Sequence, residues 1–558
     1  MIPLGEHEYL LGVDFGTTKT LVASYPLLQP DAGAAPRIFD RAIPTQVALP
    51  LSSGAWLIGE QVRQANPETY KTVEDLKREI ASPNIVQRNW RRAEIAGGFL
   101  AKIRQQFEDN GRCRLHGLTL TVPAKWSVEE RQATLYAARI AGFRCPVALL
   151  EEPLAAFLRS YAEDPRLLDK YGRIVVLDFG GGTCDISLIE ADPASALPLV
   201  IRSETVRVGG REIDEAIACW WLSNARIPWK GARHKPEMSA VKFIAEGVKM
   251  RLSKTVRQLR TEGAPFGLED IVESERRYYL NWADKYLEPR LSAAELEKLV
   301  QNGLDGMNVQ PHQSGATSTN PDPVRSGFLA PLGAAMEEVL SARTANGNQI
   351  PVGAVLFSGG SCELWVIQDF VTGFFRQRFP EAQIAYLPAP DASGTIQESV
   401  ALGAAWHQMY AVQGDQMAIP SLNYPIAVSV SCNGEPVRSV FFPKGVRLPV
   451  SRWDAIRKGL GYIHLFARGK HFEVRVEQQH KRPYTAELVP ERGMTPLAEL
   501  AWLCSLDEYG LVRFEVRIID MLQFKRMKDQ FYVRPMQKEF DLNEASLAKL
   551  QEALGIYG

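Results

Sequence analysis

Short apolar runs that end in glycine dominate the hydrophobic pattern of the N-terminal part of the chain. One run leads into Asp-Phe-Gly-Thr-Thr at residues 14–18, and another leads into Asp-Phe-Gly-Gly-Gly-Thr at residues 178–183. A second apolar run follows each of these segments at once. An apolar run of this kind, bounded by glycine, predicts a buried strand that turns tightly into a second strand. Because the arrangement occurs twice, we expect two related lobes.

The residues at these two turns are suited to hold a phosphate and a metal ion. Glycine lets the backbone approach a ligand closely, and consecutive N–H groups form a nest that binds anions. Asp14 and Asp178 end the two strands beside these nests, where a carboxylate can hold a hydrated Mg²⁺ ion. One copy alone is equally compatible with an ordinary glycine-rich hairpin. The repetition favours two lobes with phosphates clamped between them.

Helix signals are clear between the two turns. Ser127 and Glu130 form an S-x-x-E capping box, which predicts a helix up to Ala141 with Gly142 just beyond its end. Farther along, Glu152 precedes a proline, and because proline favours the first helical position, Glu152 is the expected N-cap. A carboxylate there is held ionised by the helix terminus. A cap with no further role is the alternative interpretation.

The next segments add a second set of strands and helices. Residues 238–260 are typical of one long helix, whereas the polar loop over 308–326 is rich in Gln, Ser, Thr, Asn and Pro. A strand at 354–357 runs into a Gly-Gly turn and a further helix, so the backbone there also offers a surface that a nucleotide can approach. Three polar residues of the long helix are spaced to share one face: Glu246, Lys249 and Ser253.

The period of the pattern changes after the segment 414–421. Alternating segments separated by turn residues then dominate, which is typical of a small antiparallel β-sandwich. The last residues predict one short amphipathic helix. We therefore expect an α/β domain with two actin-like, ribonuclease-H-like lobes, followed by a linker, a β-sandwich and a helical tail. The expected boundaries are 1–411, 412–423, 424–530 and 531–558.

Composition narrows the class of partner. The chain has a net charge of −1, so no overall field attracts nucleic acid or an anionic membrane. Its seven cysteines are scattered, with no C-x-x-C pair, which argues against a disulfide framework and a zinc site. The N-terminal residues lack the profile of a signal peptide, and no uncharged apolar stretch approaches membrane-spanning length. We expect a cytoplasmic protein that binds neither nucleic acid nor membrane.

The order of these motifs resembles the seventy-kilodalton heat-shock chaperones of the DnaK class, within the actin, chaperone and sugar-kinase ATPase superfamily. Residues 13–18 and 178–185 are similar to its two phosphate motifs, and Thr121-Val-Pro-Ala and Glu152-Pro-Leu-Ala-Ala are similar to its connecting motif. Gly209-Gly-Arg-Glu-Ile-Asp resembles the Gly-Gly-Glu-Asp-Phe-Asp turn of the family, and Gly359-Gly-Ser-Cys resembles its adenosine motif. The resemblance is densest in the first 410 residues and fainter in the β-rich part.

This resemblance implies an Mg²⁺-dependent ATPase that binds ATP and ADP. Lys77 would neutralise charge on the transferring phosphoryl group, and Glu152 would orient the attacking water. Asp14 and Asp178 would hold Mg²⁺ through its waters, and Thr183 would help to cradle the β- and γ-phosphates. The implied nucleotide-binding residues are Gly16, Thr17, Thr18, Lys19, Gly180, Gly181, Gly182, Gly209, Gly210, Glu246, Lys249, Ser253, Gly359, Gly360 and Ser361.

The chain departs from the family pattern in several places. Met250 and Glu363 occupy the positions of two arginines that usually stack on adenine, and Arg251 is the nearest substitute. Gln397 replaces an acidic residue of the family. Losing both stacking cations predicts weaker or less base-selective ATP binding. The linker lacks the acidic-then-leucine pattern, and the segment after the last sandwich strand is too short for the helical lid of the family.

The function that these observations predict is an ATP-hydrolysing, chaperone-like protein. It would bind a polypeptide client under nucleotide control, with a reduced lid or none. A J-type co-chaperone and a nucleotide-exchange factor are further partners that the resemblance implies. Two alternatives stay open: a nucleotide-gated regulatory or assembly protein with slow or no hydrolysis, and a small-molecule kinase of the same superfamily.

Overall fold

The computed structural model of the chain has a mixed α/β fold with several sheets. It describes residues 8–387 and 396–413, except 28–34, 40–41, 67, 74, 88–89, 109–112, 193–194, 196, 228–234, 264, 308–322 and 342–350. Beyond these it describes residues 422, 425–432, 435–443, 446–450, 462–467, 472–478, 484–489, 498–506, 512–519, 526–527 and 532–535.

The first large sheet contains the first glycine turn. Its strands lie in the order β11-β10-β1-β2-β3, and β4 also pairs with β2. β1 pairs antiparallel with β2 and parallel with β10, which in turn pairs parallel with β11. The predicted strand–turn–strand at residues 14–18 is therefore confirmed. The strands are β1 (Glu8–Phe15), β2 (Lys19–Pro26), β3 (Arg37–Ile38), β4 (Ile43–Pro44), β10 (Arg114–Val122) and β11 (Val147–Glu151).

The second large sheet repeats this topology. Its order, β20-β19-β12-β13-β14, has an antiparallel pair β12–β13 at the glycine turn and parallel pairs β12–β19 and β19–β20. Two sheets of the same order and strand directions are what a repeated lobe predicts, and they are consistent with actin-like ATPase lobes. The strands are β12 (Ile174–Phe179), β13 (Cys184–Ala191), β14 (Pro198–Val206), β19 (Ala354–Ser358) and β20 (Ala385–Leu387).

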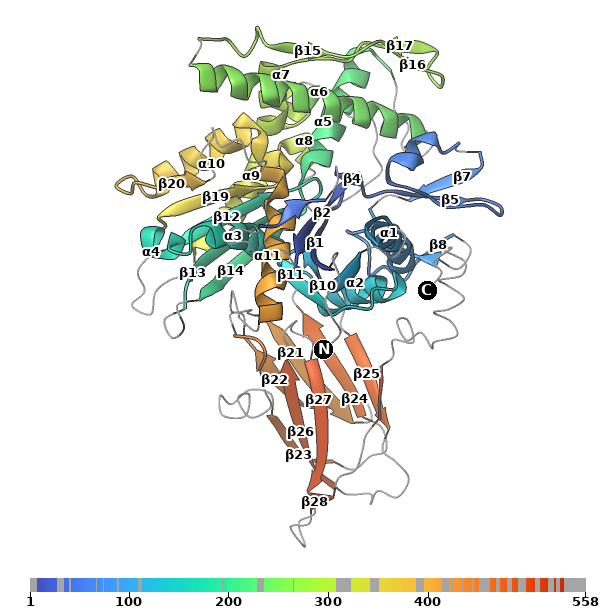
Figure 1. Cartoon of the computed structure of the whole chain (residues 1–558), viewed down its shortest axis with the longest axis vertical. Coiled ribbons are helices and arrows are strands. Elements are labelled where there is room, and N and C mark those ends of the chain that lie inside the picture. The colour runs from blue at the N-terminus through green and yellow to red at the C-terminus, as the bar shows by residue number, and fades with distance from the viewer. Residues whose placement is uncertain are drawn as a thin grey trace.

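Two helices lie between the sheets, and the others cover the outer faces (Figure 1). α11 packs against α3 and against β1, and the close approach requires glycine: a Cβ on Gly12 would lie 2.2 Å from the Ala405 nitrogen. α1 and α2 cover the first sheet, and α5, α6, α9 and α10 pack on the second. The helices so far are α1 (Arg92–Phe107), α2 (Val128–Ile140), α3 (Glu152–Glu163), α5 (Gly210–Asn224), α6 (Lys235–Glu262), α9 (Leu329–Leu340), α10 (Trp365–Arg378) and α11 (Ser399–Gln413).

Smaller elements complete each lobe. The first lobe adds β5 (Val47–Pro50), β6 (Leu57–Ile58), β7 (Tyr70–Val73), β8 (Ile85–Gln87), β9 (Trp90–Arg91) and the short helix η1 (Gly59–Gln64). The second adds α4 (Leu167–Tyr171), α7 (Ala293–Asn302), α8 (Pro323–Ser326), β15 (Val272–Ser274), β16 (Tyr278–Leu280), β17 (Lys285–Leu287), β18 (Arg290–Ser292), η4 (Asp305–Met307), η5 (Gly360–Glu363) and η6 (Ile396–Glu398).

The C-terminal part contains two antiparallel sheets below the two lobes (Figure 1). Their orders are β22-β21-β24-β25-β29 and β23-β26-β27-β28. The linker at 414–421 and the predicted helix at 541–554 lie outside the described residues. The strands are β21 (Ile426–Cys432), β22 (Glu435–Phe442), β23 (Tyr462–Ala467), β24 (Phe472–Gln478), β25 (Tyr484–Val489), β26 (Ala498–Leu506), β27 (Val512–Ile519), β28 (Arg526–Met527) and β29 (Tyr532–Pro535).

One predicted helix boundary is wrong by a residue. Glu151, with φ −72° and ψ 135°, is the N-cap of α3, so Glu152 is the first helical residue and not the cap. The backbone of Glu151 still belongs to β11, which delays the proline to the second helical position. The capping box of Ser127 with Glu130 is confirmed. Among the described helices, none has the length and apolar character that crossing a bilayer requires.

Candidate nucleotide site between the lobes

A cleft with a volume of about 1090 Å³, its open mouth included, lies between the two large sheets. Both lobes line it. Every residue predicted to bind nucleotide or to act in catalysis lines this cleft, with the exception of Gly209.

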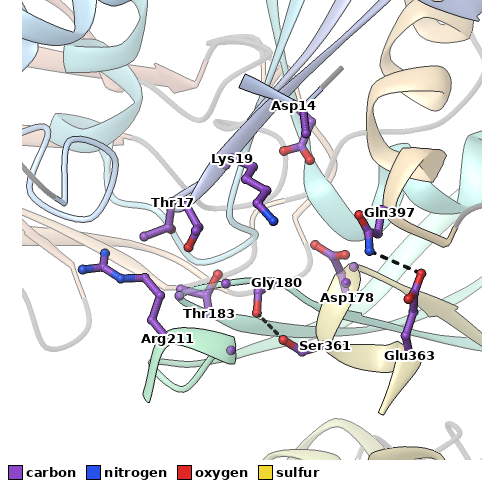
Figure 2. Close-up of a pocket in the computed structure, with 18 of the residues that line it drawn as sticks. Asp14, Thr17, Lys19, Asp178, Gly180, Thr183, Arg211, Ser361, Glu363 and Gln397 are labelled. Carbon is purple, nitrogen blue, oxygen red and sulfur yellow. Dashed lines mark hydrogen bonds between the residues drawn. The ribbon is translucent and has the colours of Figure 1, made fainter. Parts of the chain in front are cut away.

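The two glycine turns meet at the floor of the cleft (Figure 2). A Cβ on Gly181 would lie 2.2 Å from the Thr18 hydroxyl, and one on Gly182 would lie 2.6 Å from the Thr17 methyl. No side chain larger than hydrogen fits there, so glycine is required on steric grounds. The turn is closed by a hydrogen bond from the Gly180 nitrogen to the Thr183 carbonyl, 2.9 Å.

The start of α5 is fastened to the second turn. The Gly210 nitrogen donates to the Gly180 carbonyl at 3.1 Å, and the Arg211 nitrogen donates to the Gly181 carbonyl at 2.9 Å. A Cβ on Gly209 would lie 2.3 Å from the Gly182 nitrogen. Gly209 therefore lies behind the turn and supports it, which is why it does not line the cleft.

A buried ion pair forms part of the cleft lining. Lys77 donates to the Glu152 carboxylate, and the two side chains are only 3% and 6% exposed. Burial lowers the pKa of Lys77, but the carboxylates of Glu152 and Asp14 outweigh it and the net pKa is raised. The charged amine is thus held at the closed end of the cleft. Glu152 is placed there by the first turn of α3.

The carboxylates of Asp14 and Asp178 also lie in this buried region. Burial raises the pKa of Asp14 to about 7, although Lys77 opposes the shift. Burial raises the pKa of Asp178 well above its ordinary value, and the charges of Glu152 and Asp14 add to the effect. Several carboxylates crowd around one lysine, and this excess of negative charge favours a cation.

The donor set fits a hydrated Mg²⁺ ion. Asp178 Oδ1 is buried and has no hydrogen-bond partner among the described residues. Mg²⁺ is usually held by one or two carboxylates together with waters and substrate phosphates. The described part of the chain has no group of three or more His, Cys, Asp or Glu side chains that could hold a metal ion by themselves.

Polar residues of α6 line the middle of the cleft. Lys249 pairs with Asp214 at 2.7 Å and donates to the Gly210 carbonyl at 2.9 Å. From the first lobe, Lys19 reaches Glu246 at 2.7 Å. The prediction that Glu246, Lys249 and Ser253 share one helix face is confirmed by their common position on the cleft. Together they leave charged and hydroxyl groups facing the ligand space.

The far end of the cleft contains the residues that depart from the family pattern (Figure 2). Glu363 Oε2 accepts a hydrogen bond from Arg257 at 3.0 Å, and its Oε1 accepts one from the Gln397 amide at 3.3 Å. Met250 lines the cleft and is 45% exposed. Arg251, the suggested substitute, pairs instead with Glu273 at 3.2 Å. No arginine is among the described residues that line this end of the cleft.

Sequence reasoning missed three charged residues of the site. Asp214, with a pKa that burial raises to about 6, neutralises Lys249 from below. Arg211 lines the cleft, and Arg78 donates to the Gly182 carbonyl. Asp214 lay within a quoted motif and could have been considered. The positions of Arg78 and Arg211 depend on contacts across the cleft, which no local pattern reveals.

Comparisons with known proteins agree with this arrangement. Residues 57–273 match a family model described as Hsp70 protein. The chain is 25% identical over 451 residues to a chaperone protein DnaK of Ureaplasma parvum serovar 3, covering 80% of this chain and 65% of that protein. It is 29% identical over 307 residues to a DnaK of Elusimicrobium minutum, covering 52% and 46%. The matched region thus spans less than two thirds of the length of either relative.

Proposed function

We propose that this chain, which is similar to the Hsp70 family model over residues 57–273 and to DnaK chaperones at 25% and 29% identity, binds ATP with Mg²⁺ in its cleft and hydrolyses it to ADP and phosphate. The observation that carries the proposal is the Lys77–Glu152 pair, almost completely buried in the lining of the cleft that also contains the two glycine turns. Burying a charged pair costs desolvation energy that rarely benefits stability. A pair kept at the closed end of a polar cleft is therefore a candidate for chemistry.

In this proposal the chain positions the reacting groups. Backbone N–H groups of the turns at 16–18 and 180–183 cradle the β- and γ-phosphates, and Asp14 and Asp178 hold the Mg²⁺ waters. When bound, Mg²⁺ neutralises charge on the phosphates. Lys77 stabilises negative charge on the transferring phosphoryl group, and Glu152 orients the attacking water. Phosphoryl transfer depends mainly on such positioning and charge neutralisation.

The proposal extends to the C-terminal sheets. Residues 1–411 form the nucleotide-binding domain with two ribonuclease-H-like lobes, 412–423 the linker, 424–530 a β-sandwich that binds a polypeptide client, and 531–558 a short helical tail. A J-type co-chaperone and a nucleotide-exchange factor are proposed partners, and the cytoplasm is the proposed location. With a reduced lid or none, bound peptide exchanges quickly. A slow, nucleotide-gated release of peptide would contradict this part.

A product assay tests the enzymatic claim. Purified full-length chain is incubated with Mg²⁺ and ATP, and free phosphate is measured together with ADP. Equal amounts of both products support hydrolysis. ADP formed without free phosphate, with the phosphate found on an added metabolite, would instead support a small-molecule kinase.

A second candidate function is a nucleotide-gated regulator with slow or no hydrolysis. The carboxylate of Glu363 favours it, because a negative side chain now lies where the family has a cation that stacks on the base. Nucleotide binding with no phosphate release would favour this regulatory function over ATP hydrolysis.

A further inference from the structure

Two ion pairs connect the two lobes near the glycine turns. In one pair the second lobe supplies the cation, and in the other it supplies the anion. Arg211 and Glu212, adjacent residues at the start of α5, belong to the second lobe. Arg211 Nη1 pairs with Asp75, and Glu212 Oε1 accepts from Arg78 Nη1 at 2.8 Å. Asp75 and Arg78 lie on either side of Lys77 in the first lobe. The segment that carries Lys77 is therefore tied to the second lobe on both sides.

Both ends of this connection are anchored to the site itself. The Arg211 backbone nitrogen bonds the Gly181 carbonyl at 2.9 Å, and the Arg78 side chain also donates to the Gly182 carbonyl. Figure 2 shows the Arg211 side chain on the side of the cleft near Thr17 and Thr183, away from Glu363. The ion pairs thus lie at the end of the cleft that contains the two glycine turns, away from Glu363.

The backbone of Asp75 is adapted to this contact. Its φ of 58° lies in the left-handed region, one of the few such non-glycine residues in the described chain. Aspartate tolerates this conformation better than most residues. The turn that follows buries Leu76 completely and Lys77 almost completely. A shift at Asp75 is consequently transmitted to Lys77 within two peptide units.

The charge at position 211 is a departure of this chain. The Gly-Gly-Arg-Glu-Ile-Asp segment resembles a family turn with glutamate where Arg211 stands. A glutamate there would face the Asp75 carboxylate and repel it. The charges of Arg211 and Asp75 are therefore complementary, and the sequence around either residue alone does not predict the pair.

We propose that Arg211 and Asp75 form a clamp, together with Arg78 and Glu212, that closes the phosphate end of the cleft and sets the distance between Lys77 and the Gly180–Gly182 turn. Arg211 is a positioning residue in this proposal: it acts through Asp75 and the Lys77 segment. The predicted effect of the clamp on ATP hydrolysis rests on the proposed function. The closure itself does not depend on turnover.

A mutant cycle in the full-length chain tests the clamp. The variants are Arg211→Gln, Asp75→Asn and the double variant, because asparagine keeps the tolerance for a left-handed backbone while removing the charge. Each single variant is expected to lower kcat for ATP up to about fivefold, the range of partly exposed ion pairs. The double variant should be no slower than the slower single variant, since both remove one interaction.

A charge reversal at position 211 adds a stronger test of the interaction with Asp75. Arg211→Glu places two carboxylates together and should lower kcat more, about tenfold, while a second change, Asp75→Asn, should restore part of the rate. A matched control is the Arg260–Asp369 pair, which is bidentate at 2.8 Å and lies on the second lobe outside the cleft lining. Arg260→Gln should leave kcat unchanged.

Amide hydrogen exchange separates the clamp from the enzymatic claim. Without nucleotide, peptides covering 75–80 and 209–213 should exchange faster in Arg211→Gln than in wild type, and equally in Arg260→Gln. If the wild-type protein does not hydrolyse ATP but these peptides still exchange faster in Arg211→Gln than in wild type, the clamp is supported and the hydrolysis is overturned. Hydrolysis with additive single effects and unchanged exchange would overturn the clamp.

Discussion

The Gln397 amide donates to the Glu363 carboxylate across 3.3 Å at the base end of the cleft. The two residues stand where the family has an arginine and an acidic residue. By this resemblance, a cationic and an anionic residue of the family correspond here to an anionic residue and a neutral donor that contact each other. Arg257 supplies the compensating charge from outside the cleft lining.

This contact predicts that substituting both residues will change the affinity of the cleft for ATP. The double variant Glu363→Arg with Gln397→Glu restores a stacking cation and an acidic partner, and should tighten ATP binding about tenfold, from a cation–π gain of about 0.5–2 kcal/mol. Titration calorimetry with ATP and GTP measures it. Glu363→Gln is the control, because it removes the charge without adding a cation. Equal ATP affinity in the double variant and in wild type would show that position 363 does not contact the base.

The packing of α11 on α3 predicts a large loss of stability for one small substitution. A Cβ on Gly403 would lie 1.7 Å from the Ala155 carbonyl oxygen. Gly403→Ala should therefore lower the free energy of unfolding by about 1–3 kcal/mol or more, because two backbones must separate. Gly373→Ala is the matched control within a helix: its Cβ would meet nothing within 4 Å, so the protein should gain about 1 kcal/mol of helix propensity. Denaturant unfolding distinguishes the two signs.

His407 predicts a pH dependence of stability. Burial lowers the pKa of His407 from 6.5 to about 4, and its Nδ1 lies 3.3 Å from the Thr119 hydroxyl. The unfolded chain binds a proton below pH 6.5 whereas the folded chain resists it until about pH 4, so stability falls as pH decreases through this window. The contribution changes by about 1.4 kcal/mol per pH unit within it. Denaturation of His407→Gln and wild type should give diverging curves; parallel curves would refute the assignment.

The Arg447–Asp192 ion pair predicts a connection between the second lobe and the C-terminal sheets. The Asp192 side chain is fully buried, and its Oδ2 also accepts from the Ser195 hydroxyl at 2.9 Å. Asp192→Asn should weaken the contact with Arg447 and make the C-terminal part more susceptible to limited proteolysis. Arg475→Gln, which affects an exposed pair with Glu477 at 3.0 Å in the same sheet, is the control. Identical cleavage of all three proteins would mean that the pair does not hold the parts together.

Much of the fold followed from local pattern. The strand–turn–strand units at 14–18 and 178–183 were predictable because glycine and apolar runs determine them locally, and the capping box at Ser127 was predictable because it too is a local pattern. The start of α3 was misplaced by one residue, since the strand pairing of Glu151 competes with the preference of proline for the first helical position.

In the candidate site, too, some residues follow from a local motif and others depend on tertiary contacts. Residues of the two turns and of α6 were found because each lies within a short motif. Arg211 was quoted but received no role, because its partner, Asp75, belongs to the other lobe and is brought near only by the packing of the two lobes. Contacts between lobes are decided by tertiary packing and therefore stay outside sequence reasoning.

The most direct test of the account is single-turnover hydrolysis of Mg²⁺-ATP by wild type, Lys77→Ala and Glu152→Ala, with nucleotide binding and thermal unfolding measured in parallel. Removing a group that stabilises the transition state usually costs about a hundredfold or more in rate. The account predicts that wild type releases phosphate while both variants bind ATP, stay folded and stall. If either variant loses its fold, Glu152→Gln replaces Glu152→Ala and Lys77→Met replaces Lys77→Ala. Phosphate release at the wild-type rate by folded variants, or ATP binding by wild type without turnover, would contradict it.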